Sequence, residues 1–157
     1  MTISTPSAWI AMVAAERAFV DTNVLLYAHD ATETAKQPVA RAALRDLWGR
    51  RSGTLSTQVL QEFYVTATRK LPRPLSRAEA REVVDIYSAW QVVMIDPGVI
   101  IAATRIEEEH QLSFWDALIL ETARIAGADV LLTEDFQHGH VIEGVRIENP
   151  FVTSPSS

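Results

Sequence analysis

Short apolar segments alternate with longer helical patterns along this chain, and this alternation restricts the fold more than any other feature. We expect short strands at residues 18–20, 54–57, 91–95, 130–132 and 145–147. Apolar spacing with cap and stop residues predicts a helical turn after 21–23 and helices at about 38–50, 58–70, 76–89, 99–110 and 113–127. Strands separated by helices favour a parallel sheet that is covered on both faces. The predicted fold is therefore α/β, a three-layer α/β/α sandwich with a mainly parallel central sheet.

Local signals place the starts of several of these helices. Ser76 and Glu79 form the Ser-x-x-Glu pattern of a capping box, in which each side chain binds the backbone N–H of the other residue. Ser113 can cap the helix predicted at 113–127. Ser56 or Thr57 can cap the helix predicted at 58–70. These caps predict where helices begin independently of the apolar pattern.

The chain has the size and composition of one globular domain. It has 157 residues, of which 48% are hydrophobic, and we assign residues 18–152 to the domain, 1–17 to an N-terminal extension and 153–157 to a tail. Cysteine is absent, so disulfides and thiolate chemistry are excluded, and the spacing of the four histidines does not indicate a zinc site. The apolar run at 9–15 is too short to span a membrane and lacks the flanks of a secretion signal. We therefore expect a cytoplasmic protein with no membrane partner.

Charge is divided unevenly along the sequence. The formal net charge is −6, yet residues 36–81 carry ten Lys and Arg against three acids, whereas the remainder carries four against seventeen. A basic middle segment can steer a nucleic acid toward one face of the domain. The alternative is that these arginines lie on solvated helix faces.

Four acidic residues are expected at one edge of the sheet. Asp21 ends the first predicted strand, and Asp135 comes two residues after Thr133 at the end of the fourth. A right-handed crossover brings the start of the helix that carries Glu62 to the same edge, and Asp116 lies in the first turn of its own helix. Ligands bind beyond the carboxyl ends of parallel strands, so these acids are candidate site residues.

Each acid also has a purely local explanation. Asp21 or Asn23 can cap a helix, and Asp135 can form a turn. Glu62 can be a solvated helix residue, and Asp116 in a first turn favours the helix dipole whatever else it does. The sequence segments QVLQEFYV and SFWDALIL are largely apolar, however. This makes a solvent-exposed helix face a weaker explanation for Glu62 and Asp116.

Clustered carboxylates repel one another and lose solvation unless a cation or protons offset them. A set of oxygen ligands alone selects a hard divalent cation, so Mg²⁺ or Mn²⁺ is expected. Such an ion makes water a better nucleophile and binds phosphate oxygens. Hydrolysis of a phosphodiester is the reaction that this combination predicts.

The sequence resembles the PIN-domain nucleases, and within them the VapC-type ribonuclease toxins of toxin–antitoxin pairs. The resemblance rests on FVDTNVLLYA, QEFYVTATRK, SFWDALILETARIAGADVLLTEDFQHG and VIEGVRIENPF, which cover roughly residues 18–152. The DTN motif alone is weak evidence. Its combination with WDALI and LLTED in this order and at these spacings is fairly specific.

This resemblance implies cleavage of single-stranded RNA with Mg²⁺ or Mn²⁺. The acids that map onto the motif are Asp21, Glu62, Asp116 and Asp135, and the polar positions that brace such a pocket are Thr22, Asn23 and Thr133. Glu134 directly precedes Asp135 and is the alternative for the last ligand. The resemblance also implies a homodimer and a cognate antitoxin protein as partner.

Roles follow from this assignment. We expect Asp21 and Asp116 to bind the metal directly and Glu62 and Asp135 to complete the site, with one of these two taking the proton from the attacking water. Basic residues of the middle segment would bind RNA phosphates, and the candidates are Arg50, Arg51, Arg69 and Lys70.

Two other classes remain open on the sequence alone. An aspartyl-phosphate phosphatase or a receiver domain also has an Asp at the end of its first strand, but both use a late lysine, and the last lysine here is Lys70. The second alternative is a non-catalytic module of the same fold that binds RNA or an antitoxin.

Overall fold

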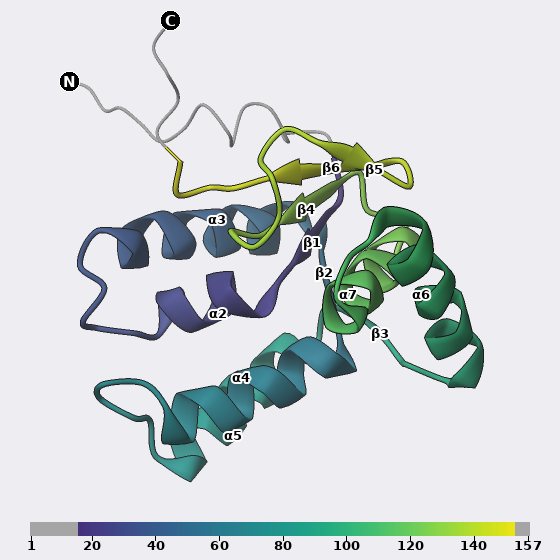
Figure 1. The fold of residues 1–157 in the computed structure, drawn as a ribbon. Helices are drawn as coiled ribbons and strands as arrows, with labels where there is room; N and C mark the ends of the chain where they lie inside the picture. The colour runs from purple at the N-terminus through teal and green to yellow at the C-terminus, as the bar shows by residue number, and fades with distance from the viewer. Residues whose placement is uncertain (1–15, 153–157) are drawn as a thin grey trace, which may run out of the picture.

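The computed structural model describes residues 16–152, and a six-stranded sheet lies at its centre (Figure 1). The strands are β1 (Ala18–Val20), β2 (Gly53–Ser56), β3 (Gln91–Val93), β4 (Val130–Leu132), β5 (Val141–Ile142) and β6 (Val145–Glu148). Their order is β3-β2-β1-β4-β6-β5, and all neighbours are parallel except β5 and β6. The predicted mainly parallel sheet is confirmed. The predictions for residues 1–15 and 153–157 lie outside the described residues.

Helices cover both faces of this sheet. Within residues 16–152 they are α2 (Thr22–Ala28), α3 (Lys36–Arg50), α4 (Thr57–Arg69), α5 (Arg77–Tyr87), α6 (Pro97–His110) and α7 (Phe114–Ile125). The chain steps from β1 to β2 to β3 in one direction, so right-handed crossovers place α2 to α5 on one face. It then returns from β3 to β4, which places α6 and α7 on the other face (Figure 1). The direction of the connections therefore reverses between β1 and β4.

Most helices begin where the sequence predicted a cap. The Ser76 and Glu79 capping box is present, Ser113 caps α7, and Ser56 rather than Thr57 caps α4. Asp96 caps α6, so this helix begins two residues earlier than the apolar pattern indicated. The sequence also missed β5, a two-residue strand, since so short a segment has no alternation to detect.

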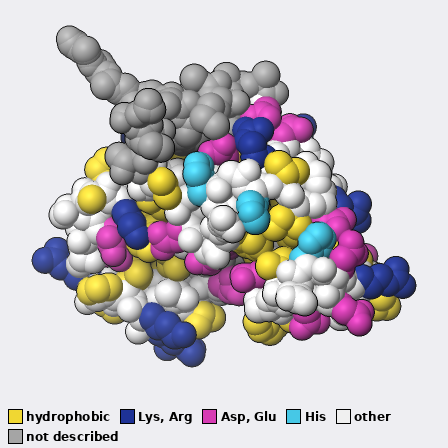
Figure 2. Space-filling view, turned by 45° about the horizontal axis from the view of Figure 1, so that its top comes forward, with side chains coloured by type: hydrophobic (Ala, Val, Ile, Leu, Met, Phe, Trp, Pro, Cys, Tyr) yellow, Lys and Arg dark blue, Asp and Glu magenta, His cyan; other side chains and the backbone are white. Residues whose placement is uncertain are grey.

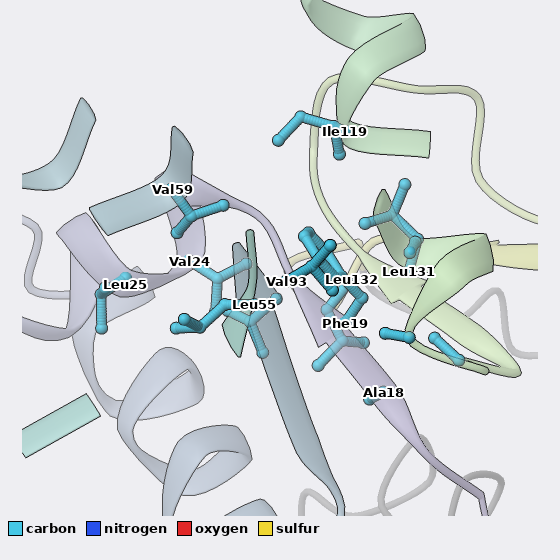
Figure 3. Packing of buried hydrophobic residues seen from close by; sticks show 14 of the residues in the cluster. Ala18, Phe19, Val24, Leu25, Leu55, Val59, Val93, Ile119, Leu131 and Leu132 are labelled. Carbon is cyan, nitrogen blue, oxygen red and sulfur yellow. The ribbon is translucent and has the colours of Figure 1, made fainter. Parts of the chain in front are cut away.

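The central strands are buried on both sides, which explains their apolar composition. Phe19 of β1 and Leu131 of β4 are fully buried, and Leu55 of β2 packs on the same core (Figure 3). Fully burying a side chain of this size contributes about 1.5–3 kcal/mol. This core holds the carboxyl ends of β1, β2 and β4 at one edge, where the candidate acids follow.

Gly53 at the start of β2 is required by its neighbour. A Cβ atom at this position would lie 2.5–2.8 Å from three ring atoms of Trp90, and that ring packs against Trp48 and Tyr87. We expect Gly53→Ala to lower the free energy of unfolding by about 1–3 kcal/mol, since a packed aromatic cluster must shift. Gly49→Ala is the matched control, because nothing lies within 4 Å of a Cβ there and α3 should gain up to about 1 kcal/mol. Urea unfolding of both variants checks that the two changes in the free energy of unfolding have opposite signs. A Gly53→Ala protein as stable as the wild type would contradict the packing argument.

Candidate active site

Asp21 is both a helix cap and a buried member of the candidate site. It follows β1, and its side chain accepts hydrogen bonds from the Thr22 backbone N–H (2.7 Å) and from the Thr133 hydroxyl (2.8 Å). Only 4% of Asp21 is exposed. Burial raises the pKa of its carboxyl to about 7, and the nearby charges of Asp135 and Glu62 act in the same direction. The two explanations that the sequence left open therefore both hold for this residue.

Glu62 lies in the second turn of α4 and is linked to the residue after Asp21. Its Oε1 accepts a hydrogen bond of 2.7 Å from the Thr22 hydroxyl, and its Oε2 accepts one of 3.1 Å from the Gln58 side chain. Glu62 is half-buried, so the solvated-face alternative does not describe it. Thr22 thus connects the helix after β1 with the helix after β2.

Asp116 lies in the first turn of α7, on the opposite face of the sheet from Glu62. Its backbone N–H binds the Ser113 hydroxyl, which caps the helix. Partial burial raises the pKa of the Asp116 carboxyl, and the Glu62 charge raises it further. The charge of Glu62 therefore reaches a residue that comes from the other layer of the sandwich.

Asp135 completes the group from the loop after β4. The Asn23 side chain donates to it at 3.1 Å, and the Thr133 hydroxyl accepts its backbone N–H at 3.0 Å. Burial raises the pKa of the Asp135 carboxyl, followed by the charge of Asp116 and then of Glu134 and Glu62. Thr133, fully buried, therefore orients Asp21 and Asp135 at once.

The structure thus brings all four predicted acids and the three predicted polar residues into one electrostatically linked group. None of the four acids forms an ion pair within residues 16–152. Figure 2 shows acidic side chains in the middle of one face, with Lys and Arg mainly toward its margins. The group lies where the sheet connections reverse between β1 and β4, which is where α/β folds bind ligands.

The donor chemistry of this group fits a hard divalent cation. Its ligand atoms are carboxylate oxygens, and beside Glu62 the buried amide oxygen of Gln58 has no hydrogen-bond partner among the described residues. No three of these four carboxylates have ligand atoms within 4.8 Å of one another. In the described part of the chain, the ligand atoms that lie within 4.8 Å of one another belong to Glu109, His110 and Glu143, an exposed surface group outside the candidate site. A cation held by some of these acids would take its remaining ligands from water or substrate.

Two of the basic candidates for RNA binding lie away from the acids. Arg50 is the last residue of α3 and Arg51 follows it. Both lie at the amino ends of the strands, where they line a hollow of about 480 Å³ together with Arg17. Arg50 is held by Asp46 at 2.7 Å. These two arginines lie at the opposite edge of the sheet from the acids, because α3 runs back along the sheet before β2 begins. They therefore lie apart from the four acids, and their binding of RNA phosphates stays a prediction.

Arg69 and Lys70 remain on the side of the molecule that carries Glu62. They are exposed at the end of α4, about 10 Å along the helix axis from Glu62. Their binding of RNA phosphates stays a prediction.

Three residues that bind acidic side chains at this edge of the sheet were missed by the sequence analysis. Gln58 binds Glu62 from one helical turn earlier, a spacing that could have indicated the contact. Lys36 and Tyr27 bind the Glu134 side chain across about a hundred residues of sequence, and no local pattern predicts such a contact. Glu134 is thus occupied by other partners, while Asp135 faces the other acids.

The fold is an α/β sandwich with a group of acidic side chains at the point where its connections reverse, and comparison with known families identifies the class of protein. The model of the PIN domain family matches residues 18–143. The chain therefore belongs to the PIN domain family, whose members are typically nucleases that bind divalent metals. No curated protein sequence matches the chain.

Solved structures with a similar fold are toxins of toxin–antitoxin systems. A toxin–antitoxin complex from Klebsiella pneumoniae is 20% identical with a TM-score of 0.64, over 85% of this chain and 97% of that one. VapC20 from Mycobacterium tuberculosis, described as a toxin that cleaves the sarcin–ricin loop, is 21% identical with a TM-score of 0.60, over 75% and 91%. DNA-bound VapBC from Salmonella typhimurium is 20% identical with a TM-score of 0.61, over 86% and 98%. At these identities the likeness establishes the fold.

No helix within residues 16–152 combines the length and the apolar character that crossing a membrane requires.

Proposed function

We propose that this protein is a metal-dependent endoribonuclease that hydrolyses single-stranded RNA, and that it is the toxin of a toxin–antitoxin pair. The observation that carries the proposal is a group of four electrostatically linked carboxylates in a PIN domain. The group has no ion-pair partner among the described residues and lies where the sheet connections reverse, between β1 and β4. Membership of a family of nucleases supports the reaction type, and the toxins of similar fold support the biological role.

In this proposal Asp21 and Asp116 hold a Mg²⁺ or Mn²⁺ ion, and Glu62 and Asp135 complete the site directly or through water. When bound, the ion would offset the charge of the scissile phosphate and lower the pKa of water. Asp21 is kept in place by the Thr133 hydroxyl and the Thr22 backbone N–H, so its orientation is set before a ligand arrives. Such preorganisation avoids a reorganisation cost during the reaction.

Glu62 and Asp135 are the candidates for accepting the proton of the attacking water. Each has at least one carboxylate oxygen fixed by a hydrogen bond, Glu62 by Thr22 and Asp135 by Asn23. Partial burial raises the pKa of the Asp135 carboxyl, which favours its acceptance of a proton near neutral pH. Arg69 and Lys70 would bind phosphates along the strand.

The proposed partners follow from the same comparison. Relatives of similar fold were solved in complexes described as toxin–antitoxin or VapBC assemblies. For this chain we propose a cognate antitoxin protein, a homodimeric state and a cytoplasmic location, where RNA is available. Co-purification with the product of a neighbouring reading frame tests the antitoxin.

Cleavage of a labelled single-stranded RNA tests the reaction. We expect the purified protein to cut it with Mg²⁺ or Mn²⁺, to stop when EDTA is added, and to recover when Mn²⁺ is restored. Asp116→Asn should lose cleavage and keep its fold, because the variant removes a charge without changing shape. Glu108→Gln, an exposed acid on α6, is the matched control and should cut at the wild-type rate.

The outcome also separates the alternatives. Cleavage that survives EDTA, or an Asp116→Asn variant that cuts normally, would reject the proposed mechanism. Binding of RNA without any turnover would favour the non-catalytic module of the same fold. The aspartyl-phosphate reading is already disfavoured, because Lys36 is bound to Glu134 and Lys70 lies at the end of α4.

A further inference from the structure

Glu134, the residue before Asp135, lies in a cluster that is separate from the four acids. The Tyr27 hydroxyl donates to its Oε1 in a short hydrogen bond, and the Lys36 ammonium donates to its Oε2 at 2.9 Å. Lys36 also donates to the Tyr27 hydroxyl at 3.2 Å. We call Tyr27, Lys36, Glu134 and Phe151 the Glu134 cluster.

Two aromatic rings shape this cluster. The Lys36 ammonium lies 4.5 Å from the centre of the Tyr27 ring and 5.6 Å from that of Phe151. The two rings meet edge to face at 5.1 Å. The cluster thus joins α2, the start of α3, the loop after β4 and the segment after β6. Both carboxylate oxygens of Glu134 are used within it.

The neighbouring Asp135 is held by a different set of contacts. Asn23 donates to its side chain, and Asn23 Oδ1 accepts the Glu134 backbone N–H at 3.4 Å. The Thr133 hydroxyl accepts the Asp135 backbone N–H. The side chains of Glu134 and Asp135 therefore diverge, one toward Lys36 and the other toward the acids.

We propose that Lys36 and Tyr27 are positioning residues: by holding the Glu134 side chain they fix the loop after β4 so that Asp135 faces the metal-binding acids. The inference rests on the proposed function for the role of the metal. It goes further by giving a task to the side chains of the lysine, the tyrosine and the glutamate, which bind one another through the hydrogen bonds given above. It also explains why Asp135, rather than Glu134, joins the site.

Lys36→Met tests this role because two explanations predict opposite changes in the affinity for Mn²⁺. If Lys36 acted only through its charge, its removal would strengthen binding of a cation at the nearby acids. If Lys36 positions the loop, its removal weakens binding, since contacts that orient metal ligands are typically worth about 10–100-fold in affinity. We expect the Mn²⁺ concentration at half-maximal thermal shift to rise about tenfold.

Three further variants complete the design. Tyr27→Phe keeps the ring but removes the hydroxyl, and it should raise the half-maximal Mn²⁺ concentration in the same direction. Lys36→Arg keeps hydrogen-bond donors and a positive charge beside Glu134, so the value should stay within about twofold of wild type. Arg105→Met, an exposed cation on α6, should leave it unchanged.

The melting temperature without metal is measured in the same series. A purely structural role would lower that temperature in Lys36→Met and leave the half-maximal Mn²⁺ concentration unchanged, which would overturn the inference. Tighter Mn²⁺ binding by Lys36→Met would overturn it as well. The measurement needs no RNA, so a wild type that binds Mn²⁺ but does not cut RNA rejects the proposed function alone. A wild type that does not respond to Mn²⁺ rejects both.

Discussion

Asp21→Asn is expected to reduce RNA cleavage by at least about 100-fold while making the metal-free protein more stable at pH 8. The loss of activity follows from removing a buried negative ligand. The gain of stability follows from burial, which raises the pKa of Asp21 to about 7. Above that pH the folded protein must bury an ionised carboxylate, at a cost of up to about 4 kcal/mol relative to the unfolded chain.

The uncharged asparagine side chain removes part of the cost of burying an ionised carboxylate. Asparagine caps helices as well as aspartate does, so the bond to the Thr22 backbone N–H is kept. The bond from the Thr133 hydroxyl must rearrange, because the amide nitrogen cannot accept it, and this costs about 1–2 kcal/mol. The net expectation is a stability gain of about 1–3 kcal/mol, measured by urea unfolding in EDTA.

Asp96→Asn is the matched control for this variant. Asp96 also caps a helix, with its side chain on the Val99 backbone N–H, but it is exposed and lies outside the acidic group. We expect neither a gain of stability nor a loss of cleavage. If Asp21→Asn were as destabilising as a broken buried hydrogen bond alone, the electrostatic account of the site would be wrong.

The stability of the metal-free protein should fall as the pH rises from about 4 to about 7. The folded-state pKa of Asp21 is above its ordinary value of 3.8, so the folded protein binds more protons than the unfolded chain in this window. Asp21 alone contributes a fall of up to about 4 kcal/mol. Asp116 and Asp135, whose pKa values are also raised, act in the same direction.

Mn²⁺ should flatten this pH profile. The ion competes with protons for the same carboxylates, so it binds more tightly as the pH rises. At a concentration of about 100 times its dissociation constant it adds about 2.7 kcal/mol, which corresponds to a rise of about 5–10 °C in melting temperature. Chemical unfolding at pH 5 and pH 8, with EDTA or with Mn²⁺, measures both effects.

An opposite contribution comes from Glu16, whose pKa is lowered by its hydrogen bonds to Arg146. That stability is present above the ordinary pKa and is lost in acid, so it affects the profile below about pH 4.5. Asp21→Asn should remove most of the fall between pH 4 and 7. A profile that stays as steep in the variant would assign the effect to other groups.

Much of the fold was predictable because its signals are local. The capping box at Ser76 and Glu79, the cap at Ser113 and the apolar strands at Ala18–Val20 and Val130–Leu132 were all found where the sequence placed them. The strand ends then gave the edge at which Asp21 and Asp135 lie, because parallel strands share one direction. Glu62 was placed at this edge by the handedness of crossovers, and Asp116 was a candidate because it lies in the first turn of its own helix.

The basic residues show where sequence reasoning was insufficient. The charge of the middle segment was counted correctly, but Arg50 and Arg51 lie across the sheet from the acids and Arg41 binds the Ala28 carbonyl. A count of charged residues does not show on which face of the domain they lie. Which face an arginine occupies depends on where its helix packs.

The sequence by itself therefore determined the elements, their order, the mainly parallel sheet and the four acids at its carboxyl edge. Only the tertiary structure decided that Thr133 orients Asp21, that Thr22 binds Glu62, and that Lys36 holds Glu134 apart from Asp135. The physical reason is range. Helix caps and apolar periodicity act within a few residues, whereas these contacts join side chains that lie 40 to 112 positions apart and meet only when the core has packed.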